Sequence, residues 1–215
     1  MKFVASYSGG KDSALALHRA VKQGHEPIFL LTTYNIERKG SFFHAIPEKM
    51  LEAVSNSMNI PLLLVRTSGT DYQERFEEAL LKAKAQGAQA CVFGDIDIEE
   101  HRRWPSERCT NTGLEPLFPL WGEDRKKIVY EFVDGGFVAH IVVLNTKCMG
   151  AEYLGQQLTR ETLAQIDKQG IDICGENGEF HTFVTGGPIF RKQISFSFGA
   201  SVVENDYAYL PVQTS

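Results

Sequence analysis

Strand-like and helix-like segments alternate along the first two-thirds of the chain, and this alternation limits the folds that it can adopt. Stretches with apolar residues at helical spacing follow most of the strand-like runs, over residues 12–23, 46–58, 71–86 and 123–133. The strand-like runs are short and mostly apolar: "KFVASY", "PIFLLTT", "PLLLVRT", "ACVFGDI" and "EPLFPLW". Strands joined through helices pair in parallel with right-handed crossovers, so the sequence predicts an α/β fold with a doubly wound, five-stranded parallel sheet.

The pattern changes after Gly135 and Gly136. The run "FVAHIVVLNT" predicts a further strand, residues 159–168 predict a short helix, and the rest is rich in turns and β-like. We therefore expect two domains, a larger one over residues 1–135 and a smaller α+β domain over residues 136–215.

Composition and charge narrow the class of protein. Hydrophobic residues make up 43% of the 215 residues, which allows a substantial core and argues against disorder. The 22 basic and 27 acidic side chains give a net charge of −5, which disfavours a general nucleic-acid binder, so no DNA partner is expected. No run approaches about 18 apolar residues and no charged leader precedes the first strand, so we expect a cytoplasmic protein without membrane contact.

The four cysteines are far apart and form no CxxC pair. This spacing argues against a zinc site or a redox dithiol and favours reduced thiols. We expect Cys174 to be structural rather than a sulfur-transferring nucleophile, since no partner cysteine lies near it in the sequence.

The segment "YSGGKDS" joins the first predicted strand to the first predicted helix. In an open parallel sheet, ligands bind outside the carboxyl ends of the strands, which is where this segment lies. Gly9 and Gly10 allow positive φ values and leave room for backbone amides to converge, and the positive end of the following helix adds to an anion site. The hydroxyls of Ser8 and Ser13 and the charge of Lys11 complete a site for which phosphate is the expected ligand.

Asp12 is the unexpected member of this loop, because a carboxylate repels a phosphate. Its presence is explained if it helps to hold Mg²⁺ between phosphate oxygens, or if it caps the helix. Asp95 ends the fourth predicted strand at the same sheet edge, where it can share Mg²⁺ with Asp12; ordinary capping of the strand end explains it equally well. The loop matches neither GxxxxGK[ST] nor GxGxxG, and a plain glycine-rich turn with an aspartate N-cap is the simpler alternative.

The loop carries a family resemblance. "SGGKDS", from Ser8 to Ser13, resembles the SGGxDS pyrophosphate loop of the N-type ATP pyrophosphatases. Members of that superfamily cleave ATP between the α- and β-phosphates and adenylate an oxygen of the acceptor. A nitrogen or sulfur nucleophile then displaces AMP.

Other blocks resemble one branch of that superfamily, the diphthine–ammonia ligase family: "FHAIP", "FGDID", "EYLGQQL" and above all "CGENGEFHTFV". The resemblance spans nearly the whole chain, although the segment "GDIDIEEHRRWPSERC" differs from the sequence of eukaryotic members at this place. That family amidates the modified histidine of elongation factor 2 with ATP and ammonium.

The resemblance implies a HUP or Rossmann-like domain of the adenine nucleotide alpha hydrolase type, with ATP and Mg²⁺ as cofactors. Together with the loop chemistry, it assigns catalysis to Lys11, Asp12 and Asp95, with Asp12 and Asp95 as metal ligands. The expected ATP contacts are Ser8, Gly9, Gly10, Lys11, Asp12, Ser13, Thr32, Thr33, His44 and Gly94. The expected contacts of a cationic substrate or of ammonium are Glu176, Asn177, Gly178, Glu179 and His181.

Several of these residues also have ordinary explanations. Thr32 and Thr33 end the second predicted strand, where β-propensity alone accounts for threonine. His44 precedes a proline-started helix and is equally explained as a helix-entry residue.

Three further basic residues, Arg102, Arg103 and Arg108, lie on a helical stretch that we expect to be irregular and broken by Pro105. A solvated charged face is the main interpretation of this stretch. The alternative is an arginine that reaches the α-phosphate or a substrate carboxylate.

The resemblance therefore predicts an ATP-dependent, amide-forming ligase that adenylates a carboxylate and releases AMP and pyrophosphate. Nitrogen is expected from free ammonium or a separate protein. The acceptor carboxylate is on a modified histidine of elongation factor 2 if the source has diphthamide. Two alternatives stay open, a tRNA-modifying enzyme of the same superfamily and an ATP-binding module without ligase chemistry, and so does a homodimer.

Overall fold

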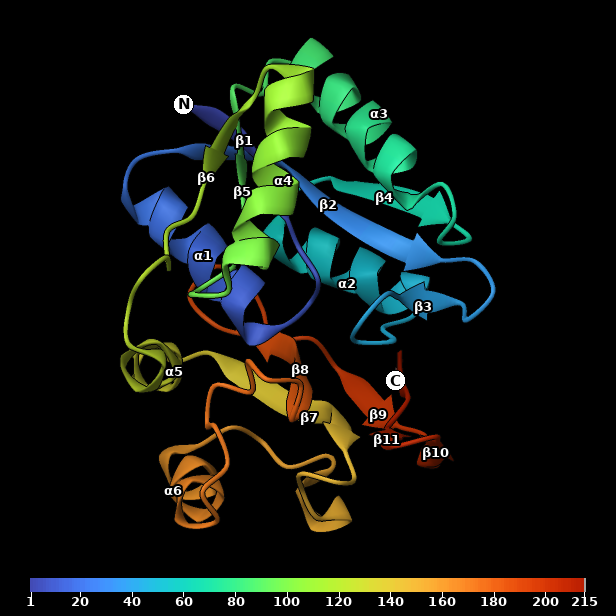
Figure 1. The fold of residues 1–215 in the computed structure, drawn as a ribbon, viewed down its shortest axis with the longest axis vertical. Coiled ribbons are helices and arrows are strands. Elements are labelled where there is room, and N and C mark those ends of the chain that lie inside the picture. The colour runs from blue at the N-terminus through green and yellow to red at the C-terminus, as the bar shows by residue number, and fades with distance from the viewer. Residues whose placement is uncertain (215) are drawn as a thin grey trace. The chain divides into compact units, whose positions relative to one another are not determined.

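The computed structural model describes residues 1–214 (Figure 1). Its contacts divide the chain into two compact units that interleave along the sequence. The first unit comprises Met1–Ser8, Asp12–Phe42 and Asn59–Glu123, and the second comprises Gly9–Lys11, Phe43–Met58 and the chain from Asp124 onward. The two domains expected from the sequence meet at one boundary, after residue 135, and that boundary stays a prediction.

The first unit is built on a six-stranded sheet, of which five strands run parallel in the order β4-β2-β1-β5-β6. The parallel strands are β1 (Lys2–Ser6), β2 (Glu26–Asn35), β4 (Leu62–Thr67), β5 (Ala90–Val92) and β6 (Glu115–Leu117). The sixth strand, β3 (Gly40–Ser41), pairs antiparallel with the end of β2. The helices of this unit are α1 (Lys11–Lys22) without its first residue, α3 (Tyr72–Ala85) and α4 (Glu99–Thr112). The predicted doubly wound, five-stranded parallel sheet is confirmed.

One face of this sheet is covered by α3 and α4, which lie next to each other in Figure 1. Val4, Leu31 and Cys91 point from β1, β2 and β5 into a core that Phe76 of α3 and Cys109 of α4 complete. Strands buried in this way consist of nearly continuous apolar runs, as the sequences of β1, β2 and β4 do.

The predicted break at Pro105 is wrong, because α4 continues through that proline from Glu99 to Thr112. Proline removes one backbone amide and frees the carbonyl of His101. His101 is exposed, so water can satisfy that carbonyl and the helix tolerates the interruption.

The sheet order places β1 between β2 and β5, where the direction of winding reverses. In open α/β sheets, ligands bind outside the carboxyl ends of the strands at this reversal point. Residues that follow Ser6 and Val92 therefore occupy the position that the fold favours for a ligand.

The second unit contains a four-stranded antiparallel sheet in the order β10-β11-β7-β8, with a separate β12-β9 pair. Its strands are β7 (Val138–Asn145), β8 (Phe180–Gly186), β9 (Phe196–Phe198), β10 (Val202–Glu204), β11 (Tyr207–Tyr209) and β12 (Val212–Thr214). Its helices are α2 (Glu48–Met58), α5 (Arg125–Asp134), α6 (Arg160–Lys168) and the short η1 (Ala151–Tyr153). The mixture of a mostly parallel sheet with additional antiparallel sheets agrees with the α/β and α+β character expected from the sequence.

Across residues 1–214, no helix combines the length and the apolar character needed to cross a membrane. All four cysteines are free thiols, and Cys148 alone among them is exposed.

Candidate functional site

The middle of the glycine-rich loop, Gly9–Lys11, runs along strand β8 in the second unit. The carbonyl of Gly9 accepts a hydrogen bond from the amide of Val184 at 2.9 Å, and the amide of Lys11 donates to Thr182 Oγ1 at 3.0 Å. Gly9 has φ of +93°, a conformation that a residue with a side chain adopts only with strain. The amide of Lys11 is thus used within the protein, so the amides able to meet an anion are fewer than the sequence predicted.

Gly10 is required for a reason that the sequence did not reveal. Its φ is not positive, so the predicted role of backbone freedom is wrong at this position. A Cβ atom here would lie 2.4 Å from Cε1 of His44, far inside van der Waals contact. Glycine is needed because the imidazole ring of His44 packs directly on the loop backbone.

His44 is held in one tautomer by its surroundings. Its Nδ1 lies 2.7 Å from the carbonyl oxygen of Thr182, which only accepts hydrogen bonds, so Nδ1 carries the proton and Nε2 is left as an acceptor. Burial, with the nearby charge of Lys11, lowers the pKa of His44 to about 4 although the Thr182 hydrogen bond opposes this. The ring of His181 lies 5.0 Å away, between centroids. Near neutral pH, His44 is therefore an uncharged acceptor beside the glycine loop.

Lys11 is almost fully enclosed, with 5% of its surface exposed. Its Nζ lies 3.7 Å from Oε1 of Glu176 and 5.8 Å from the centre of the Phe180 ring. A carboxylate and a ring face both stabilise an ammonium group that has lost most of its water. The second unit therefore brings a loop lysine and an acidic residue of the "CGENGEFHTFV" block together.

The remaining predicted acceptor residues form a compact loop. Both carboxylate oxygens of Glu179 accept hydrogen bonds from Asn177, one from its backbone amide at 2.9 Å and one from its side-chain Nδ2 at 3.0 Å. Gly178 between them has φ of +84°. His181, two residues beyond Glu179, lies on β8 with its ring near those of His44 and Phe43.

The first unit by itself contains the residues at the two ends of the loop and the predicted metal ligands. The hydroxyls of Ser8 and Ser13 lie 3.3 Å apart. A Cβ atom on Gly94 would lie 2.8 Å from both the carbonyl carbon of Asp12 and the amide nitrogen of Ser13. The start of α1 thus passes directly over the chain that follows β5, and only glycine fits at that crossing.

This crossing places Asp12 and Asp95 in each other's electrostatic field. Burial raises the pKa of Asp95 to about 7, and the charge of Asp12 contributes in the same direction. Two carboxylates that repel each other in a poorly hydrated place offer hard oxygen donors to a divalent cation, whose binding would remove the repulsion. The residues present therefore fit Mg²⁺.

Thr32 and Thr33 point to opposite faces of β2. The hydroxyl of Thr32 donates to the carbonyl of Tyr7 at 2.6 Å, and only 1% of the residue is exposed. Thr33 accepts a hydrogen bond from the hydroxyl of Tyr72 at 3.3 Å. Their proposed contact with ATP stays a prediction.

Comparison with models of protein families shows to which family the chain belongs. A diphthamide synthase N-terminal domain matches residues 1–116, and a diphthamide synthase C-terminal domain matches residues 124–213. This chain belongs to the diphthamide synthase family. The resemblance inferred from the loop and from the "CGENGEFHTFV" block is confirmed.

Relatives of this diphthamide synthase family member cover almost the whole chain. Diphthine–ammonia ligase of Danio rerio is 24% identical over 99% of this chain and 92% of its own length. The Homo sapiens protein of the same name is 22% identical over 99% of this chain and 89% of its own length. The Schizosaccharomyces pombe protein is 26% identical, but this chain spans only 39% of it. A solved predicted subunit of tRNA methyltransferase from Methanocaldococcus jannaschii aligns with a TM-score of 0.46 and 15% identity over 90% of this chain and 100% of its own, a likeness too weak to bear on function.

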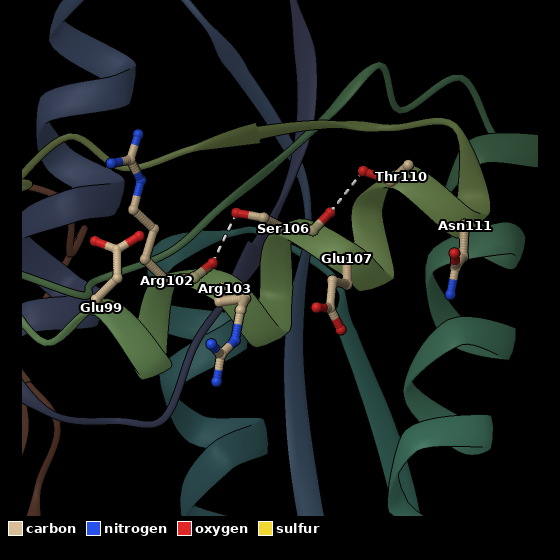
Figure 2. Close-up of a pocket in the computed structure, with 7 residues that line it drawn as sticks. All are labelled: Glu99, Arg102, Arg103, Ser106, Glu107, Thr110 and Asn111. Carbon is tan, nitrogen blue, oxygen red and sulfur yellow. Dashed lines mark hydrogen bonds between the residues drawn. The ribbon is translucent and has the colours of Figure 1, made fainter.

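In this member of the diphthamide synthase family, the arginines of α4 have separate surroundings. Arg108 is buried and pairs with Glu77 at 3.1 Å, with its guanidinium over the ring of Trp104. Arg102 lies over the ring of Trp121 at 4.7 Å. Arg102 and Arg103 are both exposed, and with the other polar and charged residues drawn in Figure 2 they line a surface pocket of about 440 Å³.

Sequence reasoning missed Thr182, Arg125 and Asp172 in this family member. Thr182 bonds both the loop and His44, and its place inside the "FHTFV" block was the available signal. Arg125 and Asp172 bond to each other across 47 residues, and nothing in the sequence pattern links them.

Proposed function

We propose that this protein is an ATP-dependent carbon–nitrogen ligase that activates a carboxylate as its adenylate and releases AMP and pyrophosphate as ammonia forms an amide. The observation that carries this proposal is the glycine loop with its enclosed Lys11, in a chain that matches both diphthamide synthase domains. The relatives named diphthine–ammonia ligase join ammonia to an acceptor, and we propose the same class of acceptor here.

The chemistry explains why ATP is needed. A carboxylate resists attack by an amine because the leaving group would be oxide. In the proposed first step, a carboxylate oxygen attacks the α-phosphorus of ATP, and the bond to the β-phosphate breaks to release pyrophosphate. Ammonia then attacks the carboxyl carbon of the adenylate, the carbon–oxygen bond breaks, and AMP leaves while the nitrogen loses a proton.

The residues of this chain supply positioning and charge neutralisation, which are the main needs of phosphoryl chemistry. Lys11 neutralises the phosphates, and the hydroxyls of Ser8 and Ser13 bind them. Asp12 and Asp95 would hold Mg²⁺, which supplies further neutralisation of the phosphate oxygens when it is bound. The neutral ring of His44 keeps the loop backbone in place from the side of Gly10.

The acceptor and ammonia belong, in this proposal, to the loop from Glu176 to His181. Its acidic character suits ammonium or a cationic acceptor such as the modified histidine of elongation factor 2. The Glu176 carboxylate is the group that we assign to this contact, because it already meets a cation, the ammonium of Lys11.

The test is to incubate the protein with α-labelled ATP, Mg²⁺, ammonium and candidate carboxylic acids, and to separate the labelled products. Labelled AMP that requires both the acid and ammonium is the expected product. Labelled ADP, or no cleavage with any acid, would overturn the ligase proposal.

A matched pair of lysine variants sharpens the assay. Lys11→Met should abolish AMP formation and weaken ATP binding, because it removes the enclosed positive charge of the loop. Lys22→Met changes an exposed lysine at the other end of the same helix and should behave as the unaltered protein. Equal activity of the two variants would remove Lys11 from the site.

A further inference from the structure

A hydrogen-bonded network anchors the loop that carries Glu176, and the proposed chemistry gives no role to two of its members, Arg125 and Asp172. Arg125, the first residue of α5, donates from Nη1 to Oδ2 of Asp172 at 2.6 Å and to Oδ1 of Asn177 at 3.1 Å. The other carboxylate oxygen of Asp172 accepts from the amide of Cys174 at 2.9 Å. Arg125 therefore joins α5 to both ends of a short loop.

Glu179 closes the far side of the same loop. Its two oxygens are taken by the amide and the side chain of Asn177, and only 8% of the residue is exposed. Because both bonds come from Asn177, the carboxylate of Glu179 points back into the turn between these two residues. Glu179 thus has the geometry of a group that shapes the loop.

In the sequence, Glu176 lies between the segment held by Asp172 and the segment held by Glu179. The amide of Cys174 is held by Asp172 on one side, and the amide of Asn177 is held by Glu179 on the other. The amide of Gly175 also donates to the carbonyl of Asp172 at 3.0 Å. With its neighbours fixed in this way, Glu176 places its carboxylate 3.7 Å from the ammonium of Lys11.

We infer that Arg125, Asp172 and Glu179 are positioning residues that hold Glu176 at Lys11. This inference rests on the proposed function and deepens it, because it separates the acidic residue that meets cations from the residues that aim it. The charged hydrogen bonds of the network are of the kind whose loss is felt strongly when they are shielded from water.

A double-mutant cycle tests this assignment. Asp172→Asn should lower kcat/KM for ammonium about tenfold in the unaltered protein, which is the scale of one lost charged hydrogen bond. The same change should have an effect below about twofold in a Glu176→Gln background, because there is no longer a carboxylate to aim. Glu179→Gln should behave in the same way. Equal losses in both backgrounds would show a merely structural role and overturn the inference.

Two further variants serve as controls. Arg125→Lys keeps the charge and should retain more activity than Arg125→Gln. Arg160→Gln removes the exposed ion pair with Asp134 in the same unit and should leave kcat/KM unchanged. A loss with Arg160→Gln as large as that with Arg125→Gln would contradict a specific role for the network.

Hydrogen exchange separates this inference from the ligase proposal. Asp172→Ala removes the acceptor of the Cys174 amide and should speed exchange there, and Glu179→Ala should do the same at the amide of Asn177, whether or not the protein makes AMP. Unchanged exchange at both amides overturns the network even if the ligase assay succeeds. Faster exchange at these amides in a protein that makes no AMP leaves the network standing and removes the proposed function.

Discussion

The ammonium of Lys11 lies 3.7 Å from the carboxylate of Glu176. The first residue belongs to the glycine loop that follows β1, and the second belongs to the acidic block that precedes β8. A nearby carboxylate favours the charged form of a buried lysine, and an anion-binding loop requires that charge. The same contact pairs Glu176 with a cation before any ligand arrives, and it links the glycine loop to the acidic block.

The close packing of His44 on Gly10 predicts a specific dependence between the two residues. Gly10→Ala should lower the free energy of unfolding by about 1–3 kcal/mol, the usual cost of forcing an extra carbon into filled space. In a His44→Ala background the same change should cost almost nothing, because the ring that it meets is gone. Chemical denaturation of the four proteins measures this coupling.

Gly24→Ala is the matched control for backbone strain. Gly24 has φ of +84°, and a Cβ atom there would have no neighbouring atom within 4 Å, so the loss of unfolding free energy in Gly24→Ala should not depend on His44. If Gly10→Ala costs the same with and without His44, the packing explanation fails.

The raised pKa of Asp95, about 7, predicts an unusual pH dependence of stability. Between about pH 4 and pH 7 the folded protein binds a proton that the unfolded chain has released, so the free energy of unfolding falls as the pH rises. In metal-free buffer this loss, measured against Asp95→Asn, should reach up to about 4 kcal/mol at pH 7. Mg²⁺ should restore part of it in the unaltered protein alone. If the free energy of unfolding depends on pH and on Mg²⁺ in the same way in the unaltered protein and in Asp95→Asn, Asp95 has no raised pKa and does not share Mg²⁺ with Asp12.

The lowered pKa of His44, about 4, predicts the opposite slope. Between about pH 6.5 and pH 4 the unfolded chain binds a proton that the folded protein excludes, so the free energy of unfolding falls as the pH falls. Because His44 is half-buried rather than fully enclosed, solvent screening reduces the effect, and the loss relative to His44→Gln should be about 1–3 kcal/mol. The imidazole signals of His44 in NMR spectra should stay constant down to about pH 5.5, and a titration near pH 6.5 would show that the ring is not shielded.

Asp12 is predicted to act on the metal rather than on the fold. Asp12→Ala should reduce AMP formation at least about a hundredfold, as removal of a transition-state charge partner does, while the unfolding free energy changes by less than about 1 kcal/mol. Asp206→Ala, which removes an exposed partner of Lys147, should leave AMP formation unchanged. An Asp12→Ala protein with full activity would show that Asp12 is a helix cap and no more.

The sheet was predictable because its strands are local and apolar on both faces. Val4 and Leu31 belong to runs that read as buried strands, and the helices between them fix a parallel order. Pro105 was misjudged because local propensity ignores the packing of α4 against α3, which holds the helix together around the missing amide.

The candidate site was predictable only in part. Gly9 follows a rule of backbone conformation that a sequence reveals, whereas Gly10 depends on His44, more than thirty residues away. The bond between Arg125 and Asp172 likewise arises from the folded arrangement of α5 and a distant loop. Contacts between residues far apart in sequence leave no periodic signal, so the loop motif was found and its supporting network was not.

The most direct test of the account follows the oxygen atoms of the acceptor. An acid that supports AMP formation is labelled with ¹⁸O in its carboxylate and incubated with the protein, ATP, Mg²⁺ and ammonium, and the released AMP is analysed by mass spectrometry. Because the proposed adenylate breaks at the bond between carbon and the bridging oxygen, the AMP should carry one ¹⁸O atom from the acid. AMP without label, or label found in inorganic phosphate, would contradict activation of a carboxylate at the α-phosphorus.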